Sequence, residues 1–203
     1  MPALGWRKYV SALVDLLDGP VEEVAPRLLG AVLRHGPVAV RLTEVEAYAG
    51  PDDPGSHSFR GPTARNQVMF GPPGHLYCYL SHGIHVCANV SVGPDGTPGG
   101  ILMRAGEVVD GIEVARAFRP GAADRDLARG PGRLGRALGI RLDHYGTDLT
   151  TGEITLTPGE PDGPVASGPR TGLRMAAERP WRYWIAGDPT VSPYRRHARG
   201  EGF

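Results

Sequence analysis

The chain has 203 residues, 22 acidic and 22 basic side chains, 40% hydrophobic residues, 30 glycines and 20 prolines. Its length and apolar content predict one folded, turn-rich domain with a sizeable core, although the glycine and proline content approaches that of disordered chains. No apolar run approaches the roughly 18 residues of a transmembrane helix, the N-terminus lacks a signal-peptide pattern, and two cysteines cannot form a disulfide scaffold. We therefore expect a cytoplasmic protein.

Two short helices are predicted at the start of the chain. The first covers residues 9–18 and ends at Gly19. The second covers residues 20–29, with Pro20 near its start and Gly30 at its end, which are the positions that these residue types favour.

Strands are predicted from residue 31 onward. A short strand over residues 31–34 and a turn precede a longer strand over residues 38–48. Period-two alternation would place five side chains of the longer strand on one face: Val40, Leu42, Glu44, Glu46 and Tyr48. Residues 49–74 are rich in Gly, Pro, Asp and Ser and predict a long loop, which in a compact domain is usually functional.

A β-hairpin is predicted over residues 75–92, with His82 and Gly83 at its tip. Residues 101–118 begin as a strand and are predicted to turn helical near Gly111.

The second half of the chain is rich in arginine. It predicts a partly helical segment over residues 124–139 and short strands between glycine and proline breaks after residue 150. Arginine supplies 21 of the 22 basic residues, with eight arginines against five acids over residues 104–141 and seven against two over residues 170–199. A chain without net charge can thus carry a basic face, which suits a polyanionic partner.

Two motifs resemble cofactor sites but lack the required context. Residues 130–135 match the glycine pattern of dinucleotide sites, yet no strand is predicted before them, so a helix start whose free amides meet a phosphate is favoured. A second group has the residue types of a zinc site: Cys78, His82, His85 and Cys87. Its two pairs differ in strand parity, so we expect no metal.

Side chains suited to a flat, hydrogen-bonding ligand follow the predicted strands. Glu46 lies two residues before Tyr48 at the end of an apolar strand, where a carboxylate needs either a raised pKa or a cationic partner. The others come from the loop and the following strands: His57, Tyr77, Tyr79, Asn89 and Arg104. Singly, each fits a salt bridge, a solvated loop residue or packing, but together they favour a pocket for a ligand such as a base.

Three segments in a specific order, TEVEAYAGPDDPGSHSFRG, ARNQVMFGPPGHLYCYLSHGIHVCANVSV and ILMRAGEV, resemble the alkyladenine (3-methyladenine) DNA glycosylase family. Weaker matches follow in ARGPGRLGRALGI and SGPRTGLRMAAERPWRYWIAGDPTVS. The resemblance implies a single α+β domain over residues 1–203, with an N-terminal helix in 1–19 and a family-like core over 20–195. Its fold would be a curved, mainly antiparallel sheet flanked by helices, with a protruding β-hairpin that inserts into DNA.

The same resemblance implies a monofunctional DNA glycosylase. Such an enzyme flips alkylated or deaminated purines out of double-stranded DNA and hydrolyses the N-glycosidic bond with an activated water, which initiates base excision repair. The implied catalytic residues are Glu46, which activates the water, and Arg104, which helps to place it. Tyr48 and Tyr79 would stack on either side of the base, and His57 would contact the base or its sugar. Asn89 would exclude ordinary guanine by crowding its amino group.

The implied DNA-binding residues lie around the hairpin: Arg65, Tyr77, His82 and Gly83. His82 departs from the family pattern, because some members have a tyrosine there. Lys8 is the chain's only lysine and lies outside every matching segment, so we expect no Schiff base and no strand nicking.

We expect a monomer associated with the nucleoid, with no cofactor and no membrane contact. The main alternative is a non-catalytic reader of damaged DNA on the same fold, which would not need Glu46 and Arg104. A second alternative is a zinc-dependent hydrolase that uses the hairpin residues.

Overall fold

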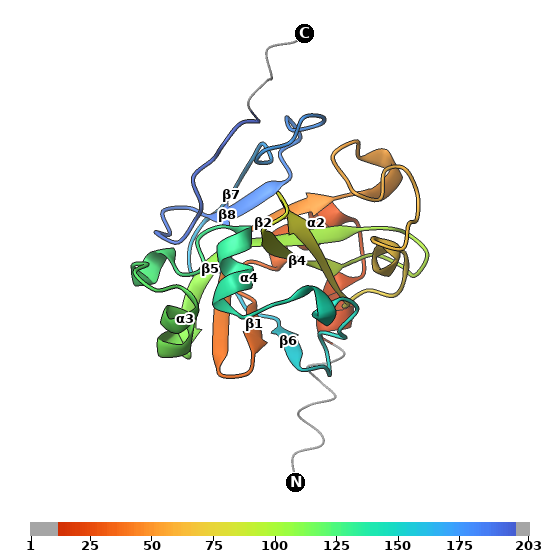
Figure 1. The fold of residues 1–203 in the computed structure, drawn as a ribbon. Coiled ribbons are helices and arrows are strands. Elements are labelled where there is room, and N and C mark those ends of the chain that lie inside the picture. The colour runs from red at the N-terminus through yellow and green to blue at the C-terminus, as the bar shows by residue number, and fades with distance from the viewer. Residues whose placement is uncertain (1–11, 198–203) are drawn as a thin grey trace.

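An eight-stranded antiparallel sheet organises residues 12–197, the part of the chain that the computed structural model describes (Figure 1). Six strands follow one another in space: β3 (Leu76–Ser81), β4 (His85–Ser91), β5 (Gly100–Asp110), β2 (Val38–Tyr48), β1 (Val32–His35) and β6 (Ile154–Thr157). β8 (Arg182–Ile185) pairs with β2 beyond the end of β1, and β7 (Val165–Gly168) pairs with β8. β2 thus has three neighbours, and the sheet curls into a half-barrel around it.

Short helices cover the sheet. Residues 12–17 are helical, α2 (Val21–Arg27) packs against β2, α4 (Pro131–Ala137) packs against β4 and β5, and α3 (Ile112–Phe118) packs against α4. Their apolar faces join those of the strands in one core. Within residues 12–197, no helix is both long enough and apolar enough to cross a membrane.

The predicted elements are confirmed in order and close to their bounds. β2 coincides with the predicted strand, β3 and β4 form the predicted hairpin, and the change from strand to helix occurs at Gly111, whose φ of 68° is left-handed. The predicted long loop contains only two short 3-10 turns, η1 (Gly50–Asp52) and η2 (Gln67–Phe70). The first predicted helix starts outside the described residues, and its described part ends at residue 17.

The predicted common face of β2 is wrong, because the pairing of β2 with β5 contains three register shifts, two of them in the middle of β2. Thr43 on β2 and Arg104 on β5 are each left without a register partner. Val40 and Leu42 face the core, but beyond the bulge the core-facing residues of β2 are Val45 and Ala47. The two glutamates and Tyr48 therefore turn to the opposite face, as bulges beside active sites commonly re-aim side chains.

The glycine-rich motif of residues 130–135 serves helix packing. A Cβ on Gly132 would lie 2.7 Å from the Cβ of His85, and one on Gly135 would lie 2.3 Å from the Val86 carbonyl oxygen. Only glycine allows α4 to approach β4 so closely. The element directly before the motif is a 3-10 turn, η3 (Asp124–Asp126). A dinucleotide site would have a strand in that position.

A buried ion pair ties the long loop to the C-terminal part of the chain. Asp53 and Arg170 both have fully buried side chains, and the Arg170 NH2 group donates to Asp53 Oδ1 at 2.7 Å. Burial alone would raise the pKa of Asp53, but hydrogen bonding and charge from Arg170 outweigh it and lower the pKa. The backbone N–H groups of Ala49 and Gly55 also donate to Asp53, so this carboxylate orders the start of the loop.

We predict that Asp53→Asn lowers the free energy of unfolding by roughly 3–5 kcal/mol, because it leaves the buried Arg170 cation without its counter-ion. Urea unfolding at pH 7 measures this loss. Asp124→Asn is the control, since Asp124 pairs with Arg116 on the surface, and its loss should be much smaller. Equal losses in the two variants would contradict a structural role for the buried pair.

Candidate active site

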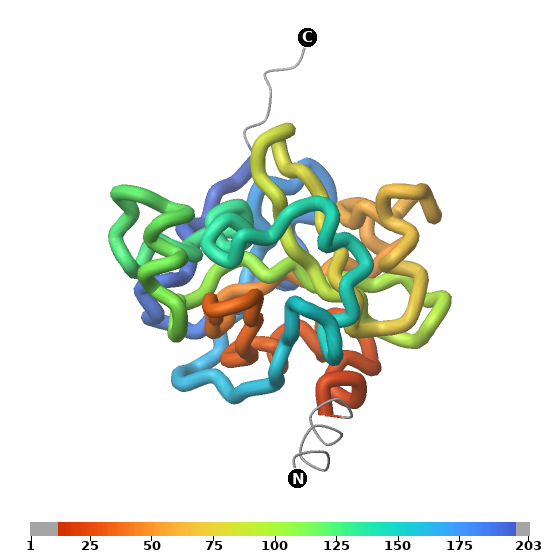
Figure 2. Tube along the Cα trace, turned by 60° about the horizontal axis from the view of Figure 1, so that its bottom comes forward, coloured from red at the N-terminus to blue at the C-terminus, as the bar shows by residue number. Residues whose placement is uncertain are grey.

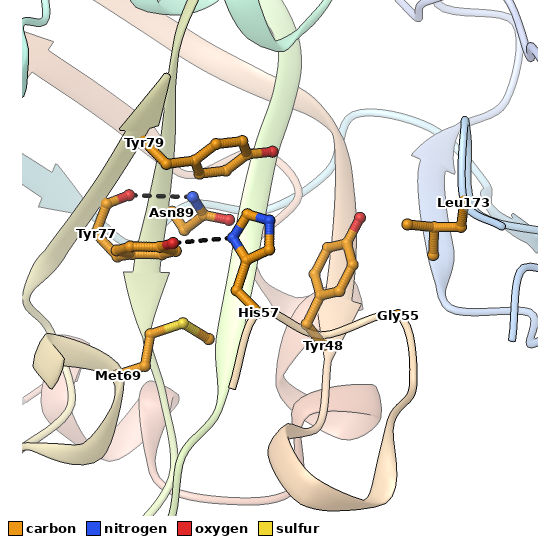
Figure 3. A pocket seen from close by; sticks show the side chains of 8 residues that line it. All are labelled: Tyr48, Gly55, His57, Met69, Tyr77, Tyr79, Asn89 and Leu173. Atoms are coloured by element: carbon orange, nitrogen blue, oxygen red, sulfur yellow. Dashed lines mark hydrogen bonds between the residues drawn. The ribbon is translucent and has the colours of Figure 1, made fainter. Parts of the chain in front are cut away.

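A pocket opens between β2, the long loop and the β3–β4 hairpin (Figure 3). Its cavity volume is about 60 Å³, well below the range of sites for drug-sized ligands. The lining side chains come from separate parts of the chain: Tyr48, Gly55, His57, Met69, Tyr77, Tyr79, Asn89 and Leu173. The structure thus brings together all four residues that the resemblance implied for a base pocket.

Three rings form one wall of the pocket. The rings of Tyr77 and Tyr79 are stacked with centroids 5.8 Å apart, and the His57 ring meets Tyr79 edge-on at 4.6 Å. His57 Nδ1 and the Tyr77 hydroxyl are hydrogen-bonded at 2.9 Å. This bond links the long loop to the hairpin and fixes the orientation of the imidazole.

The wall is uncharged at neutral pH. Burial, and then the charge of Arg65, lowers the pKa of His57 below its ordinary value. Burial raises the pKa of Tyr77 to about 12 and raises the pKa of Tyr79 well above its usual range. A cationic ligand would therefore meet neutral aromatic faces and no like charge.

The Asn89 side chain has a defined orientation. It lies directly opposite Tyr77 in the hairpin, and its Nδ2 donates to the Tyr77 carbonyl oxygen at 3.0 Å. Because a carbonyl can only accept, this bond identifies the amide nitrogen and leaves Oδ1 as the other polar atom of the side chain.

A buried carboxylate, Glu46, lies behind the pocket and is 0% exposed. Its Oε1 accepts a 2.6 Å hydrogen bond from the Thr171 backbone N–H. Its Oε2 accepts from the Tyr48 hydroxyl at 2.8 Å and from Arg104 NH1 at 3.1 Å. Three donors therefore converge on this side chain, which suits an anionic carboxylate.

A second buried carboxylate, Glu44, orients Arg104. The Arg104 Nε donates to Glu44 Oε1 at 2.8 Å, while its NH1 reaches Glu46. Arg182 Nε and the Ser192 backbone N–H also donate to Glu44, at 2.6 and 2.7 Å. Burial alone would raise the pKa of Glu44, but the charges of Arg104 and Arg182 outweigh it and lower the pKa.

Several members of this site were not identified from the sequence. Thr171 contributes a backbone amide, and Leu173 lines the pocket. Arg170 places its guanidinium 4.8 Å from the centroid of the Tyr48 ring. A usable signal was the pair of carboxylates, Glu44 and Glu46, in an apolar strand, because two buried acids require several cationic or N–H partners.

The residues expected on the DNA side separate into two groups. Tyr77 is 1% exposed and lies in the pocket wall with His57. Arg65 is exposed, with its guanidinium 5.8 Å from the Tyr79 ring centroid. His82 and Gly83 form the exposed hairpin turn, which stands out at the top of Figure 2, with φ of 50° and 73°.

The hairpin cysteines do not converge on a metal. Cys78 packs in the core, whereas Cys87 faces Tyr79 on the other side of the hairpin. One group of potential ligands in the described chain lies elsewhere, at His35, His144 and Glu153. His144 Nδ1 accepts a hydrogen bond from the Arg141 backbone N–H at 3.2 Å, so the neutral ring carries its proton on Nε2, which lies 3.8 Å from Glu153. A metal on Nε2 would move that proton to Nδ1 and break the hydrogen bond with Arg141.

Comparison with known proteins agrees with this geometry. Residues 15–189 match the family described as methylpurine-DNA glycosylase. A protein of Nocardia farcinica named "Putative 3-methyladenine DNA glycosylase" is 56% identical over 197 residues, covering 92% of each chain. Proteins of the same name from Frankia casuarinae and Streptomyces avermitilis are 53% and 51% identical, covering 88% of this chain and 91% and 89% of theirs.

We predict that Glu44→Gln lowers the free energy of unfolding at pH 7, because the ion pairs with Arg104 and Arg182 lose their charge. The stabilisation from a carboxylate with a lowered pKa is complete above the unfolded value of 4.5 and is lost as the pH falls through the folded value. The gap in the free energy of unfolding between wild type and variant should therefore stay constant well above pH 4.5 and narrow as the pH falls below that value in urea unfolding. Glu107→Gln, at a half-exposed carboxylate on β5, should show a small gap throughout. A gap for Glu44→Gln that does not depend on pH would refute this role.

Proposed function

The chain belongs to the methylpurine-DNA glycosylase family, and we propose that it removes alkylated purines from double-stranded DNA by hydrolysing the N-glycosidic bond, which initiates base excision repair. The observation that carries the proposal is the buried Glu46 carboxylate, held by three donors directly behind a neutral aromatic pocket. The names of the relatives point to the same substrate.

The pocket suits an electron-poor purine. Alkylation can leave the base cationic, and a cation over a tyrosine ring is stabilised by about 0.5–2 kcal/mol. Tyr48 and Tyr79 would stack on the flipped base, and the neutral His57 adds no repulsion. Flipping costs a few kcal/mol, and less for a poorly paired lesion, which contributes to selectivity. The Asn89 amide, oriented by the Tyr77 carbonyl, would crowd the amino group of guanine.

The chemistry requires one positioned water. Glu46 would take a proton from the water as its oxygen attacks the sugar carbon, and the departing base would keep the electron pair of the broken bond. Arg104 would hold the carboxylate in place. The Thr171 hydroxyl is buried without a partner among the described residues and is available to a water there. A general base supplies roughly 10²–10⁴-fold, which suffices for an activated leaving group.

The hairpin would approach DNA with its tip. His82, Gly83 and Ile84 are exposed at the turn, and Ile84 is 72% exposed, an unusual place for an apolar side chain. We assign this tip to the gap that a flipped base leaves in the duplex, and Arg65 beside the pocket mouth to a nearby phosphate. The enzyme would act as a monomer.

The product would be an abasic site with the strand intact. Strand cleavage requires an amine that forms a Schiff base with the sugar, and the only lysine, Lys8, lies outside the described residues and outside the matching segments. Borohydride should therefore trap no covalent adduct.

The alternative is a non-catalytic reader of damaged DNA. Such a protein would keep the aromatic pocket but would have no use for two buried carboxylates, whose desolvation costs several kcal/mol each. The retention of Glu46 with three donors favours the enzyme.

We predict that Glu46→Gln reduces release of 3-methyladenine from methylated duplex DNA by at least roughly 100-fold, because the amide cannot accept the proton. Single-turnover base release with excess enzyme measures the rate, and an electrophoretic binding assay measures affinity for the same duplex, which should change little. Glu107→Gln, a half-exposed glutamate on the same sheet, should keep the wild-type rate.

The outcomes of this experiment separate the candidate functions. Wild-type protein that binds the lesion but releases no base, including hypoxanthine and ethenoadenine, would favour the reader. Equal release by wild type and Glu46→Gln would retain the enzyme class and refute the assignment of the general base.

We predict that His82→Tyr raises affinity for DNA with an abasic site by roughly fivefold, or about 1 kcal/mol, because the larger ring fills more of the gap. His82→Ala should lower the affinity, giving the order Ala, His, Tyr in a fluorescence-anisotropy titration. An affinity that does not change across this series would remove the hairpin tip from the interface.

A further inference from the structure

A wide cleft continues from the aromatic pocket to α3 and α4. It begins at Tyr48 and Tyr79, passes the hairpin tip at His82, and reaches arginines on its far wall. Arg119 follows α3, and Arg133 lies in the first turn of α4. The cleft therefore connects the proposed base site with a basic surface, although the chain as a whole has no net charge.

Arg119 is partly buried but has no ion-pair partner within residues 12–197. No carboxylate oxygen lies within 4.0 Å of its guanidinium among residues 12–197, and its NH2 group donates only to the Asp126 carbonyl oxygen, at 3.3 Å. Its Nε–H is buried without an acceptor in the described part of the chain. Arg116, three residues earlier, is paired with both Glu113 and Asp124. Arg119 thus brings to this wall a guanidinium whose charge is not balanced by a carboxylate of the described chain.

The surroundings of Arg119 are positive. Burial, and then the charges of Arg133 and Arg136, lowers its pKa. The carboxylate in reach is Asp126, which lies 3.8 Å from Arg133 NH1 and is shared with Arg129 at 3.3 Å. We refer to Arg119, Arg133 and Arg136 as the arginine cluster; Arg119 and Arg133 line the cleft, and Arg136 is exposed on the same helix as Arg133.

We propose that the arginine cluster binds phosphates of the DNA backbone on the side of the lesion away from the pocket's aromatic wall. Like charges gathered beside a cleft destabilise the free protein, and an anion removes this repulsion. A guanidinium binds a phosphate bidentately through two of its N–H groups, and the NH1 group of Arg119 has no acceptor among residues 12–197. The position at the far wall matches a duplex whose flipped base occupies the pocket, so this inference rests on the proposed function.

The test uses affinity for undamaged duplex DNA as a function of salt. The slope of log affinity against log salt falls by about 0.9 for each phosphate contact that is lost. We expect the double variant Arg119→Gln/Arg133→Gln to lower the slope by about one to two, with roughly tenfold weaker binding at 0.1 M salt for each contact. The loss should be equal for damaged and undamaged duplexes, and base release at saturating enzyme should not change.

Two variants control for charge and folding. Arg116→Gln removes a neighbouring arginine that is already paired, and its slope should match wild type. Arg119→Lys/Arg133→Lys keeps both charges and should restore most of the slope. Thermal unfolding of each variant verifies that it is folded.

Several results would overturn the proposal. If the Gln double variant keeps the wild-type salt slope, the arginines do not contact phosphates. If it binds DNA normally but releases less base at saturating enzyme, the arginines act in the chemical step. If inorganic phosphate stabilises wild type but not the double variant and the DNA slope is unchanged, the cluster takes a free anion and not DNA. A wild-type protein that releases no base but shows the expected slopes refutes the glycosylase function and retains the phosphate site.

Discussion

The burial of two carboxylates on one strand determines much of this structure. Glu44 and Glu46 are both 0% exposed, and an ionised carboxylate removed from water costs several kcal/mol unless protein donors replace the solvent. Those donors come from distant parts of the chain: Arg104 on β5, Arg182 on β8, and the backbone amides of Thr171 and Ser192. The C-terminal segments therefore fold back over β2, and the site is complete only when they do.

Two of the three register shifts between β2 and β5, at Thr43 and at Arg104, decide where these charges lie. With uninterrupted pairing, Glu44 and Glu46 would point into the core beside Val40 and Leu42. The extra residue on β2 exchanges the faces, and the extra residue on β5 restores the pairing, so both strands continue and Arg104 reaches both glutamates. A small change of register thus converts an apolar strand into one that has a core face and a functional face.

The molecule separates three electrostatic environments although its net charge is zero. The aromatic pocket is neutral, the network behind it is buried and paired, and the arginine cluster beside the cleft has an excess of positive charge. This arrangement suits a partner that combines a flat base for the pocket with a chain of phosphates for the arginine cluster. Glycines that match a nucleotide-binding pattern have a different purpose here, since Gly132 and Gly135 let α4 pack closely on β4.

Local residue patterns were sufficient to predict the order and bounds of most elements, including β2, the hairpin and the switch to helix at Gly111, because these depend on residues only a few positions apart. The sequence also indicated which side chains line the pocket, through the order of three motifs. Tertiary structure decided the bulged register, which reversed the predicted face of β2, and moved Tyr77 from the expected DNA surface into the pocket wall. The folded chain also sets the donors of Glu46 and forms the Asp53–Arg170 pair. Thr171 and Glu46, and likewise Arg170 and Asp53, are more than 100 positions apart in the sequence. A backbone amide has no residue signature, and a buried charge reveals that it needs a partner but not which one, so these contacts became visible only when the chain was folded.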